Sequence, residues 1–379
     1  MRVVSAILED FRNLSVRVDL ACGINVFVGR NGQGKTNFLE ALFVACMGRS
    51  FRPGRLADLV RFSAPGATVE LGVEERGIVT PVRVSIAGSQ RRHRVGGRDN
   101  CSLSEVAQMI RAVFFGPDDL DLVKGSPSGR RSFLDEAIRV HHPPYERLLM
   151  GYQRLLRDRN QLLRDFGSGR HPPEELLASY EGELARWGGQ IVSHRSRYLR
   201  DYSPMAVELV ARHTGGQLTL ELAHECTAGP CGGAIEVGDA QEMLLGRLRD
   251  LRGEDIRSGS TTVGPHLDDL RLDVNGRAAR LFASQGEQRQ VAVSMKLAQL
   301  ALWRQKFGVT PLLLLDDVLS ELDSTRIRLL LDAIAGWQVQ AVLTTTAPPD
   351  VVWKDDDACF RVKEGGICRV DFDKVADEA

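Results

Sequence analysis

Alternation of hydrophobic and polar positions predicts β-strands near the N-terminus. Residues 2–11 and 14–20 alternate loosely and are rich in valine and isoleucine, as half-buried strands are. Residues 68–98 alternate again around a glycine-rich break at 96–97. We therefore expect antiparallel strands, joined as hairpins, in this second region.

Unbroken apolar runs predict strands that are buried on both faces, as in a parallel sheet. One run, residues 24–29, leads into a glycine-rich loop and then into a helical pattern that Gly48 is placed to end. A second run is the four leucines at 312–315, and residues 338–346 are a candidate for a third strand.

Residues 132–202 have apolar positions at three- and four-residue spacing, which predicts amphipathic helices. His171-Pro172-Pro173 interrupts the pattern, so we expect a compact helical hairpin rather than a long coiled coil. Another helical run, 287–306, is small or apolar around much of its circumference and should be largely buried.

The length and composition of the chain add an expectation about the number of packed units. A chain of 379 residues is too long for one ordinary core, so two or three packed units are expected. The first residues contain no apolar signal-peptide core, and there is no apolar run long enough for a membrane span. We expect a soluble, cytoplasmic protein with no membrane partner.

The cysteines suggest neither a disulfide framework nor a metal site. Seven are scattered along the chain without a CxxC pair, so we expect them to be buried and reduced. His224, Cys226 and Cys231 cluster in the sequence, but they lack a fourth ligand at zinc spacing. We therefore do not expect a metal there.

The net charge of −1 says nothing about partners, but the basic residues are unevenly distributed. Local basic patches on a near-neutral protein are compatible with contacts to a nucleic-acid backbone, and the alternative is a set of solvated faces and ion pairs. The candidates for DNA contact are Arg91, Arg92, Arg94, Lys124, Arg130 and Arg131.

Residues 29–36, GRNGQGKT, match the phosphate-binding pattern GxxxxGKT in full, between a predicted strand and a predicted helix. Glycines let backbone N–H groups approach phosphate oxygens, Lys35 reaches the terminal phosphates, and Thr36 offers a hydroxyl to Mg²⁺. The sequence therefore predicts a nucleotide site.

Asp316 and Asp317 directly follow the leucine run. The strand delivers Asp316 at its carboxyl end, where it can hold Mg²⁺ through water, and Asp317 is placed to polarise an attacking water. An exposed pair at a helix start is the alternative, but it fits poorly behind a core strand. These two motifs alone leave many nucleotide-binding families open.

The stretch Ser284-Gln285-Gly286-Glu287-Gln288 begins a helical run and fits a capping box, in which Ser284 and Glu287 each bond the other's N–H group. A helix N-terminus carries free N–H groups and partial positive charge, so it can also bind an incoming phosphate. Both roles are compatible with the sequence.

The phosphate loop, this serine motif and Asp-Asp-x-x-Ser-Glu-Leu-Asp at 316–323 together resemble the ABC-type ATPase head, in which the serine motif is the signature that contacts the γ-phosphate held by the opposite subunit. Further stretches resemble the RecF family of bacterial recombination mediators. They are 9–14 (EDFRNL), 114–120 (FFGPDDL), 122–127, 130–135 and 262–270 (TVGPHLDDL). The resemblance covers most of the chain and is weakest across 135–250.

The resemblance implies an α/β fold: an ABC-type head with a mixed sheet and an antiparallel lobe, plus a short helical second domain. The implied division is 1–130 and 246–379 for the two parts of the head and 131–245 for the helical domain. It implies ATP and Mg²⁺ as cofactors, with Thr36 and Asp316 at the metal and Lys35 and Asp317 catalytic.

The RecF family resemblance also implies the remaining site residues. The residues expected at the nucleotide are Arg12, Asn13, Gly29, Arg30, Asn31, Gly32, Gln33, Gly34, Lys35, Thr36 and Asn37. Ser284, Gln285, Gly286, Glu287 and Gln288 would act in trans on the other subunit's ATP. Ser320, Glu321, Leu322 and Asp323 would form the D-loop across the dimer seam, and Thr344–Thr346 would occupy the switch position.

The implied activity is that of an ATP-dependent homodimer that binds duplex or gapped DNA and hydrolyses ATP weakly, with stimulation by DNA. Its implied partners are RecR, with RecO and RecA in the same pathway, in DNA repair, recombination and replication. Three departures from the ABC pattern bear on this. Asp317 stands where glutamate is usual, which suits slow turnover, and the switch histidine is absent. The usual Q-loop glutamine is not evident, and Asp118 is a candidate substitute for it.

Two other functions fit part of the pattern. A transporter-coupled ATPase would dock its helical domain on a membrane partner, and loss of DNA binding at raised salt would distinguish the DNA-binding function from it. A compact SMC- or RecN-type structural protein would need a longer and less interrupted helical insert.

Overall fold

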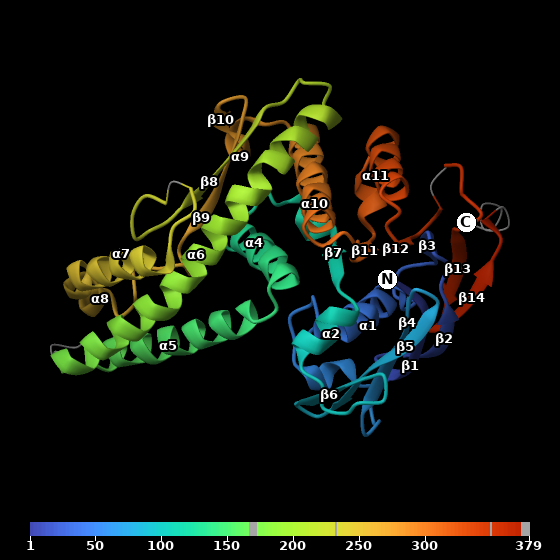
Figure 1. Ribbon diagram of the computed structural model, residues 1–379, viewed down its shortest axis with the longest axis horizontal. Helices are drawn as coiled ribbons and strands as arrows, with labels where there is room; N and C mark the ends of the chain where they lie inside the picture. The colour runs from blue at the N-terminus through green and yellow to red at the C-terminus, as the bar shows by residue number, and fades with distance from the viewer. Residues whose placement is uncertain (167–172, 232, 349–350, 373–379) are drawn as a thin grey trace. The chain divides into compact units, whose positions relative to one another are not determined.

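The computed structural model describes residues 1–166, 173–231, 233–348 and 351–372 (Figure 1). The chain divides into two compact units, which we call the sheet unit (Met1–Leu120 with Trp303–Ala379) and the helical unit (Asp121–Leu302). Among the described residues, no helix is both long enough and apolar enough to cross a bilayer.

The central sheet of the sheet unit is mostly parallel, and only its edge strand β14 runs antiparallel to its neighbour. In order, its six strands are β14 (Gly366–Val370), β13 (Ala358–Lys363), β3 (Ile24–Val28), β12 (Ala341–Thr345), β11 (Leu312–Asp316) and β7 (Ala112–Phe115). Every residue of β3 and β12 is buried, as expected for strands covered on both faces. The strands predicted from the three apolar runs are thus confirmed.

A second sheet in this unit is antiparallel throughout, which confirms the predicted hairpins. In order, its five strands are β2 (Leu14–Asp19), β1 (Arg2–Phe11), β4 (Ala67–Glu75), β5 (Ile78–Ala87) and β6 (Gln90–Val95). Helix α1 (Lys35–Met47) contacts strands of both sheets, and most of its side chains are buried. The core of the unit therefore surrounds α1, whose first turn carries the phosphate-loop residues.

Shorter elements complete the sheet unit. They are η1 (Leu56–Leu59), α2 (Leu103–Met109), α3 (Pro117–Leu120), η2 (Val318–Glu321) and α11 (Ser324–Gly336). Gly48 ends α1 in the left-handed region, φ 67°, as its position predicted.

The helical unit combines a set of helices with a small antiparallel sheet of order β10-β9-β8. Its elements are α4 (Pro127–His141), α5 (Tyr145–Phe166), α6 (Glu174–His213), β8 (Leu220–Glu225), α7 (Val237–Asp250), α8 (Arg252–Ser258), β9 (Asp269–Val274), β10 (Arg277–Ala278), α9 (Ala279–Phe282) and α10 (Gln285–Phe307), whose last turn belongs to the sheet unit. Helices α5 and α6 confirm the predicted hairpin, although 171–172 of the predicted break lie outside the described residues. Ten consecutive residues of α10, 291–300, are buried, as predicted.

The unit boundaries differ from the predicted 130/131 and 245/246. The helical unit begins at Asp121 and extends to Leu302, so it includes the stretch 246–302 that was assigned to the head. The reason lies in contacts between elements that are distant in the sequence. Strand β8 pairs with β9, and α7 packs along α6, so this stretch shares a core with the helices that precede it.

Candidate functional site

The glycine-rich loop lies between β3 and α1 and needs glycine for two different reasons. Gly34 caps α1 with φ 113°, and a Cβ there would approach Asn13 and Leu14 at 3.0 Å. At Gly29 a Cβ would lie 2.4 Å from the Val362 carbonyl oxygen, so the loop passes directly against β13. Glycine at these positions lets the backbone follow this tight path to the N-terminus of α1, where free N–H groups can bind phosphate.

Lys35, in the first turn of α1, is 6% exposed, and its ammonium group donates to the backbone carbonyls of Gly29 and Arg30. Burial lowers the pKa of Lys35, while Asp317 and Asp316 act in the opposite direction. The cation is therefore held over the loop, where a phosphate would replace the carbonyls as its partner.

Thr36 and Asp316 meet although 280 positions separate them: the Thr36 hydroxyl donates to Asp316 Oδ1 over 2.8 Å. Thr344 Oγ1 donates to the same oxygen, also over 2.8 Å, because Thr344 and Asp316 are register partners on the parallel strands β12 and β11. Hydroxyl and carboxylate oxygens are the ligands that Mg²⁺ prefers, so this pair fits the predicted metal position. The sequence assigned Thr344 to the switch position but did not connect it to Asp316.

Asp317 is held in an unusual backbone conformation for a non-glycine residue, with φ 50°. Its N–H donates to the carbonyl oxygen and hydroxyl of Thr344, and its own carbonyl accepts from Ser320. The carboxylate oxygen Oδ1 is buried and has no hydrogen-bond partner within the described part of the chain. Burial raises the pKa of Asp317 above its ordinary value, against the effect of Lys35. Such a carboxylate is suited to accept a proton from water.

Two side chains from the turn between β1 and β2, Arg12 and Asn13, approach the loop differently. Asn13 accepts from Asn37 over 2.8 Å and lies near the Gln33 carbonyl, so it contacts the loop, while its contact with the nucleotide stays a prediction. Arg12 instead uses two guanidinium nitrogens to bind Glu40, a carboxylate with no exposed surface. Its contact with the nucleotide stays a prediction.

No sequence pattern predicts two further sets of contacts at this site. Glu40 accepts from Ser50 and Arg52 as well as Arg12, so a single buried carboxylate organises three residues around α1. The turn between β13 and β14 also secures the loop, because the Glu364 N–H donates to Gln33 Oε1 over 2.6 Å and the Gly365 N–H to the Gln33 carbonyl over 3.1 Å.

The signature stretch opens helix α10 and forms the predicted capping box. The Ser284 N–H donates to Glu287 Oε2 over 2.7 Å, and the Glu287 N–H donates to Ser284 Oγ over 3.3 Å. These bonds hold the pKa of Glu287 below its ordinary value. Ser284 and Gln285 are exposed, so the helix start is accessible, whereas the phosphate contact remains a prediction.

The residues that the family resemblance assigned to the D-loop, the Q-loop and the switch position lie in described parts of the chain. Ser320 and Glu321 end η2, Leu322 is buried, and Asp323 caps α11 by accepting from the Arg326 N–H over 2.9 Å. Asp118 is exposed on α3, while its neighbour Asp119 accepts from the Gly116 N–H. Thr345 is buried at the end of β12, and Thr346 is exposed.

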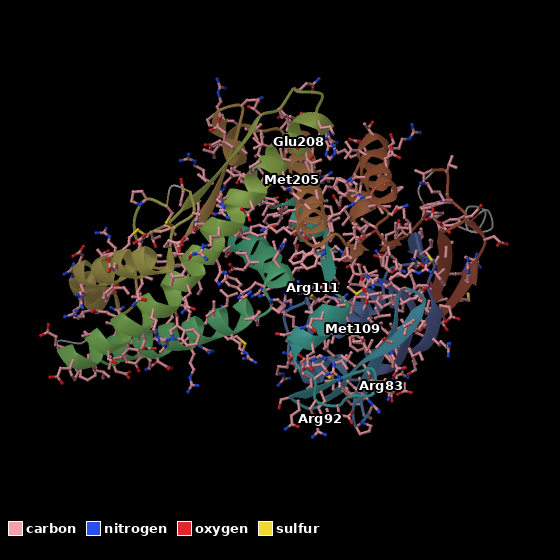
Figure 2. The ribbon with its side chains drawn as sticks, viewed as in Figure 1. Arg83, Arg92, Met109, Arg111, Met205 and Glu208 are labelled. Atoms are coloured by element: carbon pink, nitrogen blue, oxygen red, sulfur yellow. A yellow bond between two sulfur atoms is a disulfide. The ribbon has the colours of Figure 1, made fainter. Side chains whose placement is uncertain are left out.

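The DNA-contact predictions need correction at Arg130. Arg130 is 6% exposed and binds Asp269 with two nitrogens, and half-buried Arg131 donates to the Asp268 carbonyl. Arg130 is a structural contact of the helical unit, because a buried guanidinium that binds a carboxylate with two nitrogens cannot also face a DNA phosphate. The contact of Arg131 with DNA stays a prediction. Among the remaining candidates, Lys124 is exposed, and Figure 2 shows Arg92 on the edge strand β6.

The remaining candidates on β6, Arg91 and Arg94, differ in exposure. Arg91 is half-buried, and Arg94 is exposed with Asp99 3.4 Å away.

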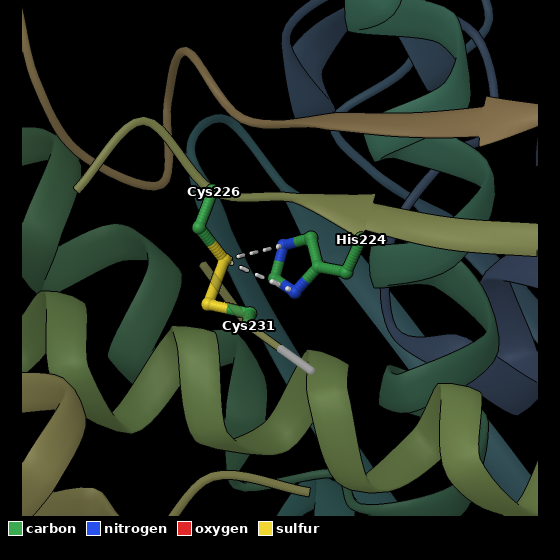
Figure 3. A group of neighbouring side chains, drawn as sticks. All are labelled: His224, Cys226 and Cys231. Atoms are coloured by element: carbon green, nitrogen blue, oxygen red, sulfur yellow. Dashed lines mark hydrogen bonds between the residues drawn. A yellow bond between two sulfur atoms is a disulfide. The ribbon is translucent and has the colours of Figure 1, made fainter. Parts of the chain in front are cut away.

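The expectation that all cysteines are buried and reduced is wrong for four of them. Cys226 and Cys231 form a disulfide beside His224 (Figure 3), and Cys22 and Cys368 are exposed. Chain reversal after β8 brings Cys231 back to Cys226, a proximity that residue spacing alone does not predict.

The comparisons with known proteins agree with this geometry. The RecF/RecN/SMC N terminal domain family matches residues 2–365. The DNA replication and repair protein RecF of Desulforudis audaxviator (strain MP104C) is 38% identical over 348 residues, which is 91% of this chain and 94% of the relative. RecF of Myxococcus xanthus (strain DK1622) is 36% identical over 369 residues, 94% and 95% of the two chains.

Solved structures support the same assignment. Two structures of the recombination mediator protein RecF in the RecFOR pathway, RecF-ATPrS and RecF-ATP, match with TM-scores of 0.88 and 0.84 at 30% identity, covering 98% and 97% of both chains. An SmcHead structure, at 17% identity and a TM-score of 0.51, shares the fold, which confirms the predicted ABC-type α/β class. Since the family match spans most of the chain and the relatives exceed 30% identity over nearly their whole length, the chain belongs to the RecF family.

Proposed function

We propose that this chain is an ATP-dependent, DNA-binding recombination mediator whose ATP state controls its grip on DNA. The observation that carries the proposal is the meeting of Thr36 and Asp316 at 2.8 Å, next to Lys35 and Asp317. These four residues are of the types that bind ATP and Mg²⁺. The RecF relatives are named for DNA replication and repair and for recombination, which is why we propose a role there.

The residues divide the ATPase work between them. Thr36 and Asp316 would hold Mg²⁺, which neutralises phosphate charge when it is bound. Lys35 reaches the terminal phosphates, and Asp317 orients and deprotonates the attacking water. Asp317 has a shorter side chain than the glutamate usual in ABC ATPases, so we propose that hydrolysis is weak, stimulated by DNA, and serves as a switch.

In this proposal, one copy of the chain contacts only one side of the bound ATP. The exposed helix start at Ser284 would contact the γ-phosphate bound by a second copy, through Ser284 and backbone N–H groups. Glu287, held in the capping box, keeps its negative charge directed at its own helix rather than at the phosphate. ATP thereby becomes the link that joins two chains into a homodimer.

We propose that this dimer binds duplex or gapped DNA through its backbone and works with RecR, RecO and RecA in the pathway that the RecF relatives are named for. Lys124 and Arg92 are the strongest remaining candidates for phosphate contact. Contacts of this kind are insensitive to base sequence and strongly dependent on salt.

The test is duplex-DNA binding with and without ATP and Mg²⁺, for the intact chain and for Ser284→Arg. A matched control exists in the same chain: Ser102 and Glu105 form a second capping box, at the start of α2. Ser102→Arg therefore removes an equivalent cap at a helix that has no predicted phosphate.

We expect Ser284→Arg to lose the ATP-dependent increase in DNA binding and ATP-dependent dimerisation by sedimentation, whereas Ser102→Arg keeps both. Binding of ATP to the single chain should survive in Ser284→Arg and be lost in Lys35→Ala. If Ser284→Arg responds to ATP as the intact chain does, the stretch 284–288 is only a cap and the dimer proposal is wrong.

A further inference from the structure

The end of strand β8 and the loop after it gather three side chains that commonly bind metals (Figure 3). His224 lies near the carboxyl end of β8, Cys226 directly follows that strand, and Cys231 returns from the loop. Their potential ligand atoms all lie within 4.8 Å of one another. This cluster belongs to the helical unit and takes no part in the nucleotide site.

The distance between the histidine and one cysteine suits a tetrahedral metal. Zinc bonds of about 2.3 Å to sulfur and about 2.0 Å to nitrogen place an N–S ligand pair about 3.5 Å apart and an S–S pair about 3.8 Å apart. In the structure, Cys226 Sγ lies 3.4 Å from His224 Nδ1. The Cα atoms of Cys226 and Cys231 lie 6.2 Å apart, so both sulfurs reach the same space from different backbone positions.

A buried carboxylate supports the histidine from its other side. Asp268 is 1% exposed, and its Oδ2 lies 3.3 Å from His224 Nε2. Arg195 lies 3.7 Å from the same oxygen, and Oδ1 accepts from the Thr227 N–H and hydroxyl. A carboxylate behind a metal-binding imidazole fixes the tautomer and leaves the opposite nitrogen free to bind. Here that nitrogen is Nδ1, which lies 3.4 Å from Cys226 Sγ, while Nε2 lies 3.7 Å from the same sulfur.

We propose that Cys226, Cys231 and His224 bind a zinc-class divalent transition metal when the disulfide is reduced, with Asp268 as the positioning residue behind the imidazole. Two thiolates and one imidazole select soft-to-borderline metals over Mg²⁺ or Ca²⁺. A water or an external ligand completes the fourth position. The disulfide and the metal compete for the same two sulfurs, so the site responds to the redox state of its surroundings.

The chemistry balances in two steps. A dithiol reductant transfers two electrons and two protons to the Cys226–Cys231 disulfide, which becomes two thiols while the reductant becomes a disulfide. The metal dication then replaces the two thiol protons, which pass to solvent, and forms two metal–sulfur bonds and one bond to His224 Nδ1.

The metal would also secure the loop after β8. Thr227 already links this loop to the segment before β9, because its hydroxyl donates to Asp268 Oδ1 and to the Gly264 carbonyl. A metal held by Cys231 would close the loop at a second point. The sequence hypothesis that no metal binds here rested on a missing fourth ligand in the chain, which a water can replace.

The experiment uses the full chain, reduced with a phosphine that becomes a phosphine oxide by taking oxygen from water, and then freed of it without air. Co²⁺ is the probe, because thiolate-to-cobalt charge transfer and tetrahedral d–d bands report both the ligands and the geometry. We expect one Co²⁺ per chain with both kinds of band, displaced by Zn²⁺, and no bands from the oxidised chain.

Matched variants identify the ligands. Cys226→Ser, Cys231→Ser and His224→Ala should each lose the bands or weaken Co²⁺ binding at least about 100-fold, whereas Cys368→Ser, at an exposed free cysteine, should bind as the intact chain does. Asp268→Asn should weaken binding by about 10–100-fold with an unchanged band pattern.

Circular dichroism of each variant establishes that it is folded. The proposal is wrong if the reduced intact chain shows no charge-transfer band, or if the band persists in Cys226→Ser; the pair is then a disulfide only.

Discussion

Glu40 places a carboxylate with no exposed surface at the core of the sheet unit, where it accepts hydrogen bonds from Arg12, Arg52 and Ser50. Glu40→Gln keeps the shape but leaves two arginines facing an amide that carries no charge. We expect the free energy of unfolding to fall by about 2–3 kcal/mol, because a buried charge network loses its anion. Urea titration followed by circular dichroism measures the change.

The matched control is Glu70→Gln, which removes a carboxylate 2.7 Å from Arg83 (labelled in Figure 2), at a site where both side chains are partly exposed. There we expect a loss below about 1 kcal/mol, because solvent screens the pair. Equal losses at the two positions would contradict the role given to Glu40.

Asp317 has a folded pKa raised above its ordinary value, mainly by burial. A carboxylate of this kind stabilises the fold when it is protonated, and it loses that contribution as pH rises through the folded pKa. At neutral pH its charge therefore opposes folding, and Asp317→Asn should have an unfolding free energy no lower than that of the intact chain. Urea titration at neutral pH measures it.

The same substitution should remove catalysis while ATP binding is kept. A missing general base costs on the order of 100-fold or more in rate. We expect Asp317→Asn to lose phosphate release to that extent and to bind ATP with unchanged affinity, while Asp19→Asn, at an exposed position, behaves as the intact chain does. Hydrolysis by Asp317→Asn at the intact rate would remove Asp317 from the catalytic role.

At the scale of elements, the chain contains two capping boxes with the same chemistry, Ser284 with Glu287 and Ser102 with Glu105. Replacing either serine by alanine should cost about 1 kcal/mol of stability, because one helix N–H group loses its acceptor. Thermal unfolding of both variants measures this. A loss confined to one of them would mean that the other box is not formed in solution.

The capping box of α10 also makes a prediction about pH. Hydrogen bonds from Ser284 hold the pKa of Glu287 below its ordinary value. The contribution is therefore fully present above the ordinary glutamate pKa and is lost as pH falls through the folded pKa. Ser284→Ala should reduce this part of the acid dependence of stability, which urea titrations at a series of pH values would detect.

At the scale of the whole molecule, a net charge of −1 gives no general attraction to DNA, so any binding must come from local patches. We expect duplex affinity to fall steeply with salt, and Arg92→Gln and Lys124→Gln each to reduce the salt slope by about one. Fluorescence anisotropy across a salt series measures the slope.

The control for these charges is Arg212→Gln, an exposed arginine that pairs with Glu208 on α6 (Figure 2). It removes one positive charge from the molecule without touching either candidate. A slope that changes equally in all three variants would mean that overall charge, rather than the two candidate positions, governs binding.

The boundary between the two units could not be predicted from local sequence patterns. The helical pattern indicated a helical hairpin over 132–202, but not that its second helix α6 continues to His213 or that 246–302 joins it. Pairing of β8 with β9 decides that boundary, and such pairing joins strands more than forty residues apart, beyond the reach of local periodicity.

The sequence by itself determined the features that contiguous residues build: the glycine loop between strand and helix, the buried strand ending at Asp316, and the capping box at Ser284. These depend on backbone dihedrals and on hydrogen bonds within a few residues. The family resemblance came from the same short stretches, because each preserves a local geometry that chemistry requires.

Only the tertiary structure decided which distant side chains meet. It paired Arg12 with Glu40, removed Arg130 from the DNA candidates by binding it to Asp269, and set Asp268 behind His224. Each of these partnerships follows from burial, since a charge or polar group taken out of water must find a partner wherever the packing brings one. No spacing rule along the chain encodes that choice.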